Sequence, residues 1–86
     1  MTTVAAIKDK LATLQPTRLD IIDDSAHHAG HAGARDGGGH FRVHIVSERF
    51  VGLPTMARHR LVYDALGTLM EGAIHALSIT ARTPAE

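Results

Sequence analysis

Apolar residues recur at helical spacing in two parts of the chain. The first set is Val4, Ile7, Leu11 and Leu14, and the second is Leu61, Val62, Ala65, Leu66 and Leu69. Thr2 or Thr3 can cap the first helix, and Pro16 cannot continue it because proline lacks the backbone N–H. Pro54 suits an early position of the second helix, which Gly67 can break. The pattern predicts one helix before Pro16 and a main helix after Pro54.

Three other segments alternate between apolar and polar residues, as half-buried strands do. They are residues 18–24, residues 40–48 and residues 74–82. The side chains expected to share the apolar face are Leu19 and Ile21 in the first segment, Phe41, Val43 and Ile45 in the second, and His75, Leu77, Ile79 and Ala81 in the third. We therefore expect three strands, and Pro84 ends the last of them.

The predicted order is helix, strand, long loop, strand, main helix (unbroken or as two helices), strand. Two helices on one face of a three-stranded mixed sheet bury both apolar stripes and the inward faces of the strands. We expect an α+β fold with two layers, a single domain over residues 1–86 and a partly exposed second sheet face. Residues 25–39 form a loop of mainly Gly, Ala and His between the first two strands.

Composition narrows the possible chemistry. The chain has 86 residues, nine Lys and Arg against nine Asp and Glu, and no cysteine. It therefore has no disulfide, no thiolate nucleophile and no cysteine-based metal site of its own. No apolar run approaches the roughly 20 residues that span a bilayer, and no secretory signal begins the chain, so we expect a cytoplasmic protein with no membrane contact.

Histidine is the unusual residue, with seven copies, four of them between Ala26 and Phe41. Neutral imidazole is a common ligand for transition metals, so the loop histidines His27, His28 and His31 can bind a metal such as zinc. The alternative is a surface loop that is only rich in histidine. His75, at the mouth of the last strand, is either a ligand held by the strand end or a hydrogen-bonded histidine at the edge of the core.

Other candidates have weaker patterns. Arg49, Arg58 and Arg60 can form a basic patch near the main helix that suits phosphate contacts, although such patches are commonly ordinary surface. We interpret His59 as a structural residue whose ring packs on the apolar stripe of this helix, and we interpret Tyr63 as structural too. No nucleophile elbow, phosphate-binding loop, dinucleotide fingerprint or HExxH motif occurs, so we do not expect an enzyme.

Four segments together resemble the BolA family. They are residues 40–43 (HFRV), 46–52 (VSERFVG), 58–63 (RHRLVY) and 74–79 (IHALSI), and the resemblance extends over about residues 7–84. It implies a class II KH-like α+β domain in which the last strand runs parallel to the second.

The resemblance also implies a partner and a cofactor. BolA proteins form heterocomplexes with monothiol (CGFS-type) glutaredoxins and share a [2Fe-2S] cluster, for which the glutaredoxin and glutathione supply thiolates. The C-terminal ligand of the family falls on His75, and the loop ligand falls on His28, with His31 as the close contender. This expectation agrees with a chain that has many histidines and no cysteine. We expect the chain to be a monomer or weak homodimer when it is alone.

The family has a second described role as a DNA-binding transcriptional regulator of morphology and stress response. In this chain the corresponding surface, near a helix-turn-helix-like region, would include Arg49, Arg58 and Arg60. Because the formal net charge is zero, we expect any DNA binding to be weak and strongly dependent on salt.

Overall fold

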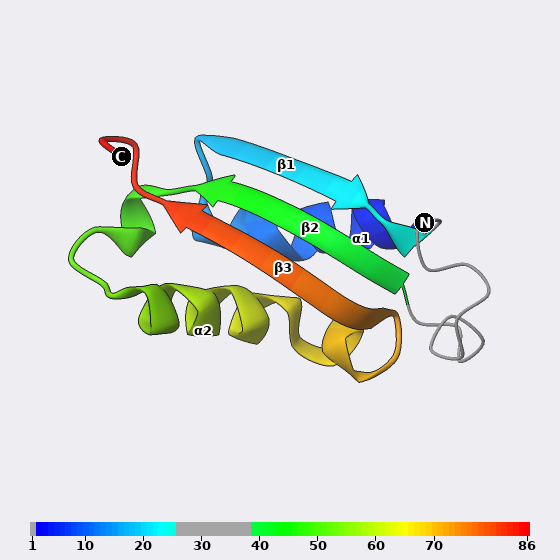
Figure 1. Cartoon of the computed structure of the whole chain (residues 1–86). Helices are drawn as coiled ribbons and strands as arrows, with labels where there is room; N and C mark the ends of the chain where they lie inside the picture. The colour runs from blue at the N-terminus through cyan, green and yellow to red at the C-terminus, as the bar shows by residue number, and fades with distance from the viewer. Residues whose placement is uncertain (1, 26–38) are drawn as a thin grey trace.

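The computed structural model describes residues 2–25 and 39–86. The helices and strands are α1 (Thr3–Leu11), β1 (Arg18–Asp23), β2 (Gly39–Val46), α2 (Thr55–Leu66) and β3 (Ile74–Arg82), shown in Figure 1. Short 3-10 helices, Ala12–Leu14, Glu48–Phe50 and Gly67–Glu71, follow α1, β2 and α2 respectively. This order is the predicted one, and within the described residues no helix is long and apolar enough to cross a membrane.

The first helix begins and ends where the sequence predicts. The Thr2 hydroxyl accepts a hydrogen bond from the Ala5 N–H at 3.1 Å and so caps the N-terminus of α1. The chain leaves the helical region at Gln15, whose φ of 51° is left-handed, and Pro16 follows. The residues of this segment that enter the core are Ile7, Leu11 and Leu14.

The sheet is mixed, with β2 in the centre. β1 pairs antiparallel with β2, and β3 pairs parallel with β2, which confirms the predicted mixed sheet and the strand direction implied by the resemblance. Phe41, Val43 and Ile45 of β2 are buried, and the intervening Arg42 and His44 are exposed. Because alternate side chains point to opposite faces, the described residues bury one face of the sheet and leave the side chains of the other face exposed.

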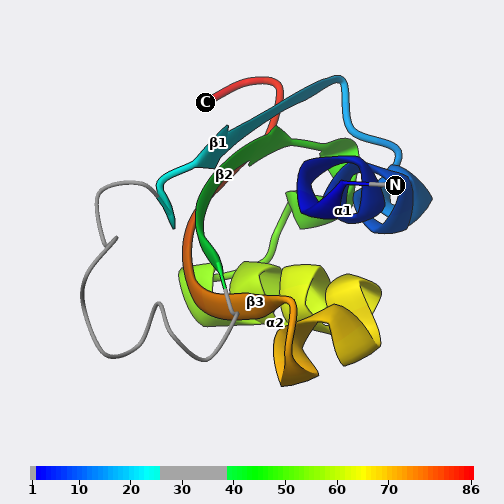
Figure 2. The same cartoon turned by 90° about the vertical axis from the view of Figure 1, so that its right-hand side faces the viewer.

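Both helices lie on the same face of the sheet, as Figure 2 shows. α2 contributes Val62 and Leu66, both fully buried, to the core between the layers. It ends at Gly67, whose φ of 54° permits the break there that the sequence predicts. The predicted two-layer α+β fold is therefore confirmed.

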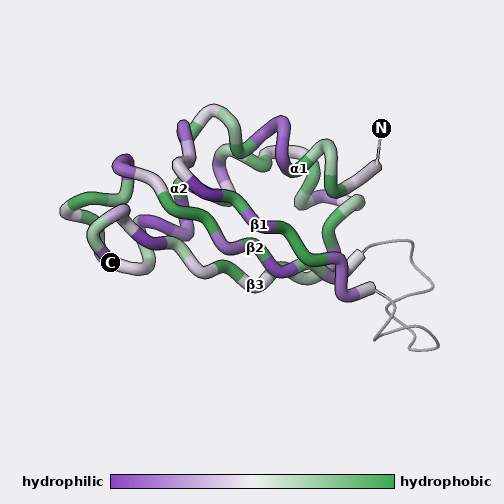
Figure 3. The backbone as a smooth tube through the Cα atoms, turned by 90° about the horizontal axis from the view of Figure 1, so that it is seen from above, coloured by the Kyte–Doolittle hydropathy of each residue, from purple (hydrophilic) through white to green (hydrophobic). Residues whose placement is uncertain are grey.

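None of the helices that the structure describes covers the opposite face of the sheet. Seen from above in Figure 3, hydrophilic and hydrophobic residues alternate along the strands. Ile22 is 50% exposed on this face, where the register places it opposite Arg42. The sequence predicted this partly exposed face correctly.

Two local predictions need correction. The second strand ends at Val46 and not at Glu48, because the fully buried Ser47 caps a 3-10 helix through its hydroxyl, which accepts from the Arg49 N–H at 3.1 Å. The first strand likewise ends at Asp23, one residue earlier than predicted. Most of the predicted loop, residues 26–38, lies outside the described residues.

Candidate metal centre at the start of β3

His75 is exposed at the beginning of β3, next to a register shift. Ile74 pairs with Gly39, whereas the next paired residue of β3 is Ala76, opposite His40. His75 is thus an extra residue in β3, as in a β-bulge. The bulge changes the alternation: Ile74 is 2% exposed and belongs to the core, and His75 does not share the half-buried environment of Leu77. The sequence expectation that His75 lies on the apolar face was therefore wrong.

The two ends of the long loop meet beside this bulge. The Asp24 N–H donates to the His40 carbonyl at 2.7 Å, and the His40 N–H donates to the Ser25 hydroxyl at 3.1 Å. The Gly39 N–H donates to the carbonyl of Ala73 at 3.0 Å. The segment that carries His28 and His31 therefore begins and ends at the same end of the sheet as His75.

Ser25 and Gly39 form the closed stem of this loop. The Ser25 N–H donates to Asp23 Oδ1 at 2.9 Å, and hydrogen bonds from Ser25 lower the pKa of the Asp23 carboxyl. A Cβ on Gly39 would lie 2.7 Å from Cζ of the Phe41 ring and 2.9 Å from the Ser25 hydroxyl. Only glycine permits this close approach without a shift of the stem.

A second histidine accompanies His75. The rings of His40 and His75 have centroids 5.2 Å apart, with their planes tilted by 49°. Sequence reasoning did not select His40. One signal could have selected it. His40 directly follows the long loop, in the second strand, and the resemblance implies that the strand of His75 runs parallel to that strand.

A shallow cavity of about 320 Å³ lies beside His40 on the open face of the sheet. Asp24 and Arg42 line it and form an ion pair, with 2.5 Å between Arg42 Nε and Asp24 Oδ2. The hydrogen bond to Asp24 also raises the pKa of Arg42. Asp24, at the loop stem, is thus ion-paired with Arg42 of β2.

The donor set of this site is imidazole. Within residues 2–25 and 39–86, no group of three or more His, Asp or Glu side chains is placed to hold a metal ion. His28 and His31, the predicted loop ligands, lie outside the described residues, as does His27. An exposed imidazole such as that of His75 fits a metal shared with a second molecule, because that molecule can approach it and supply further ligands.

The three arginines of the predicted basic patch lie in different surroundings. Arg49 is exposed, and its Nη2 donates to Gln15 Oε1 at 3.2 Å. Arg60 is exposed and lines a different cavity from Arg58. Arg58 has a side chain only 13% exposed and forms an ion pair with Glu86. The arrangement therefore leaves Arg49 and Arg60, and not Arg58, as exposed cations of this region.

His59 and Tyr63 both lie in α2. His59 is half-buried and lines the groove between α2 and β3, together with Ile79. Tyr63 is 41% exposed, so a large part of its ring is at the surface. Neither lies in the cavity beside His40.

Comparisons with known proteins show the family. The family model described as BolA-like protein matches residues 11–86. A SufE-like protein 1, chloroplastic/mitochondrial, from Arabidopsis thaliana is 46% identical, over 93% of this chain and 23% of that protein. BolA-like protein 1 from Mus musculus is also 46% identical, over 95% of this chain and 58% of the mouse protein. The chain thus spans less than two thirds of the length of either relative.

Two solved structures have the same fold. BolA1 from Arabidopsis thaliana superposes with a TM-score of 0.84 and 40% identity, covering 99% of this chain and 95% of that one. The BolA domain of SufE1 from the same plant gives a TM-score of 0.82 and 40% identity, covering 99% and 96%. With a family model that matches nearly the whole sequence and solved relatives that share its fold, this chain belongs to the BolA-like family.

Proposed function

We propose that this chain binds a monothiol (CGFS-type) glutaredoxin and contributes His75 as an imidazole ligand to a [2Fe-2S] cluster shared between the two proteins. The observation that carries the proposal is the position of His75: exposed, on a β-bulge, and beside the stem of the loop that contains the other candidate ligands. The SufE-like name of one relative with a BolA domain adds a hint of an iron–sulfur role.

Each protein would supply part of the ligand set. This chain has no cysteine, so it offers imidazoles from His75 and from His28 or His31, and thiolates come from the glutaredoxin and glutathione. A neutral imidazole in place of a thiolate raises the reduction potential of an iron–sulfur cluster. Because only the neutral imidazole ligates, the shared complex should weaken as the pH falls.

The proposed role is non-enzymatic and cytoplasmic: the chain would help to traffic the cluster or to sense iron. The parallel pairing of β2 and β3 and the hydrogen bond between Gly39 and Ala73 hold the start of β3 against the loop stem. His75 would therefore be presented by a rigid strand, while the second ligand would come from the loop.

Visible circular dichroism tests the proposal. The purified chain is titrated into a cluster-loaded monothiol glutaredoxin with glutathione, as wild type, His75→Ala, His28→Ala and His31→Ala. We expect a changed spectrum with the wild type and loss of that change with His75→Ala, and loss with either loop variant identifies the second ligand. His44→Ala, which changes an exposed histidine of β2 outside the cavity beside His40, is the matched control. An unchanged spectrum with His75→Ala would contradict the proposal.

DNA binding remains the alternative function. The structure gives it less support than the sequence does, because Arg58 is largely buried and ion-paired with Glu86. A charge-reversal test is therefore better made at Arg49 and Arg60, which are exposed. If the wild-type chain leaves the glutaredoxin spectrum unchanged, this alternative becomes the preferred function.

A further inference from the structure

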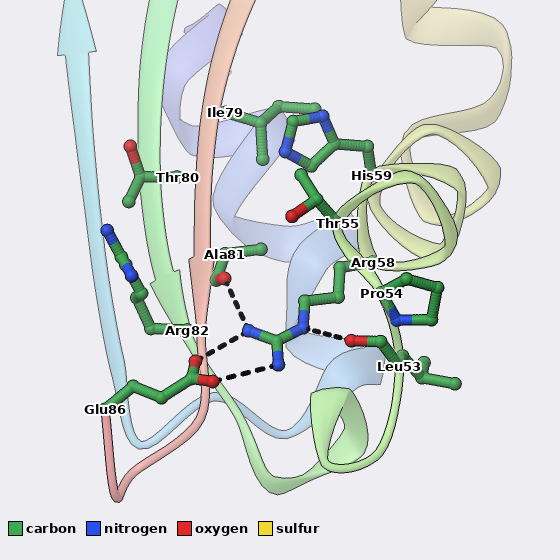
Figure 4. A pocket seen from close by; sticks show the side chains of 10 residues that line it. All are labelled: Leu53, Pro54, Thr55, Arg58, His59, Ile79, Thr80, Ala81, Arg82 and Glu86. Atoms are coloured by element: carbon green, nitrogen blue, oxygen red, sulfur yellow. Dashed lines mark hydrogen bonds and ion pairs between the residues drawn. The ribbon is translucent and has the colours of Figure 1, made fainter.

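A groove of about 480 Å³ lies between the N-terminal half of α2 and the C-terminal half of β3. Figure 4 shows its walls: the segment before α2 and α2 itself on one side, and β3 with the following tail on the other. It shares no lining residue with the cavity beside His40.

Arg58 is held rigidly in this groove. Its Nε donates to the carbonyl of Leu53 at 2.8 Å, and its Nη1 donates to the carbonyl of Ala81 at 3.1 Å. These two carbonyls come from opposite walls, so together they set the plane of the guanidinium group. An arginine fork oriented in this way is suited to a planar carboxylate or to a phosphate.

The fork already holds a carboxylate of the same chain. Arg58 Nη1 and Nη2 donate to Glu86 Oε1 and Oε2 at 2.6 Å and 3.0 Å, and the Thr83 N–H donates to Oε1 at 2.9 Å. Three donors thus converge on one oxyanion. The hydrogen bond from Arg58 is the main cause that lowers the pKa of Glu86 to about 2, so this carboxyl stays ionised.

The other charged groups of the groove favour an anion. Among the described residues that line it, Arg58 and Arg82 are cationic and Glu86 is the only acidic one. Glu86 lies in an exposed tail, Pro84, Ala85 and Glu86, with a side chain that is 38% exposed. It can therefore leave the groove without uncovering the core.

We propose that this groove is a binding site for a small oxyanion, a carboxylate or a phosphate group, and that Glu86 is an internal ligand that competes for it. In the closed state Glu86 occupies the donors of Arg58 and Thr83, and an external oxyanion must displace it. The apparent affinity of the wild type is therefore reduced by the fraction of molecules that are open. The half-buried Ile79 and Leu53 would contact the rest of the ligand.

NMR titration of the full chain tests this inference. Inorganic phosphate and acetate are added separately at constant ionic strength, and the signals of Arg58 Nε–H and the Thr83 amide are followed. We expect Glu86→Ala to bind at least one of these anions about ten-fold more tightly than the wild type, because the internal competitor is gone. Tighter binding of phosphate than of acetate assigns the site to a phosphate group, and the reverse assigns it to a carboxylate.

Two matched controls separate direct competition from a general effect of charge. Glu71→Ala removes the same charge from an exposed residue outside the groove and should leave the affinity at the wild-type value. In the Glu86→Ala background, Arg58→Lys keeps the charge but removes the fork, and binding should weaken about ten-fold, whereas Arg60→Ala should not change it. Equal affinities for Glu86→Ala and Glu71→Ala would overturn the proposal, even if the Arg58 variant failed to fold.

Discussion

At the scale of single residues, the surroundings of a side chain decide its role more than its type does. Arg58 and Arg60 stand two positions apart in one motif, yet the side chain of Arg58 is 13% exposed and binds two backbone carbonyls and Glu86, whereas Arg60 is exposed. Truncation of Arg58 would leave the Leu53 and Ala81 carbonyls without this donor. We therefore regard Arg58 as the residue that holds the tail in place and that supplies the fork of the proposed oxyanion site.

The ion pair of Arg58 and Glu86 predicts a dependence of stability on pH. In the fold the pKa of Glu86 falls from 4.5 to about 2, chiefly through the hydrogen bond from Arg58. A depressed carboxyl pKa stabilises the folded state above the unfolded-state pKa, and this contribution is lost as the pH falls through the folded-state pKa. We expect Glu86→Gln to unfold more easily than the wild type at pH 7, with a difference that shrinks between about pH 4.5 and pH 2.

Urea unfolding at pH 7, 4 and 2 measures this difference. Solvent screens a pair that is partly exposed, so the expected effect is modest. Glu71→Gln, at an exposed position outside the groove, removes the same charge and is the control. A difference between wild type and Glu86→Gln that stayed constant down to pH 2 would contradict the assignment.

At the scale of elements, the junction of β1, β2 and β3 determines where the candidate ligands can meet. The bulge at His75 and the hydrogen bonds of Asp24, Ser25 and Gly39 lie at one end of the sheet. In the proposed shared complex, the sheet would supply His75 from a strand and a closed stem, and the second ligand would come from the loop.

Gly39 is the element-scale test of this stem. A side chain at this position would lie against Phe41 and within 2.9 Å of the Ser25 hydroxyl, so Gly39→Ala should destabilise the fold by roughly 1–3 kcal/mol, as overpacking does. Gly72→Ala is the matched control, because a Cβ there meets nothing within 4 Å. Chemical denaturation measures the free energy of unfolding of both variants. Equal values would show that the stem accommodates a Cβ at position 39 without loss of stability.

At the scale of the whole molecule, stability rests on one layer of contacts between the helices and the covered face of the sheet. The buried apolar residues are Ile7, Leu11, Leu14, Phe41, Val43, Ile45, Phe50, Val62, Leu66 and Ile74. A domain of this size buries only about 60% of the surface that its unfolded chain exposes. Each of these buried residues therefore contributes a large share of the free energy of unfolding.

Leu66 and Met56 provide a matched pair on α2. Leu66 is fully buried, and its replacement by Ala should cost about 2–5 kcal/mol, through the lost burial and the cavity left behind. Met56 is 81% exposed, so Met56→Ala should change the stability by less than about 0.5 kcal/mol. Thermal unfolding compares the two variants. A small loss for Leu66→Ala would mean that α2 contributes little to the core.

Local patterning was sufficient for most of the fold. The last strand has the predicted bounds, Ile74–Arg82, and the helices begin and end within a few residues of the predicted signals at Thr2, Pro16, Pro54 and Gly67. These features depend on residues close together in the chain: caps, prolines, glycines and the period of the apolar positions. The choice of His75 as a candidate also came from the sequence, through the resemblance of its motif.

Features that depend on long-range pairing were not predictable in this way. The bulge that exposes His75 arises from the register of β3 against β2, and the 5.2 Å approach of His40 to His75 follows from the same pairing. The ion pair of Arg58 is made with Glu86, which is 28 residues away. The types of the amino acids and the spacing of the apolar positions determine the helices, the strands and the faces that they bury. Contacts between distant segments depend on how these elements pack, so they exist only in the folded chain.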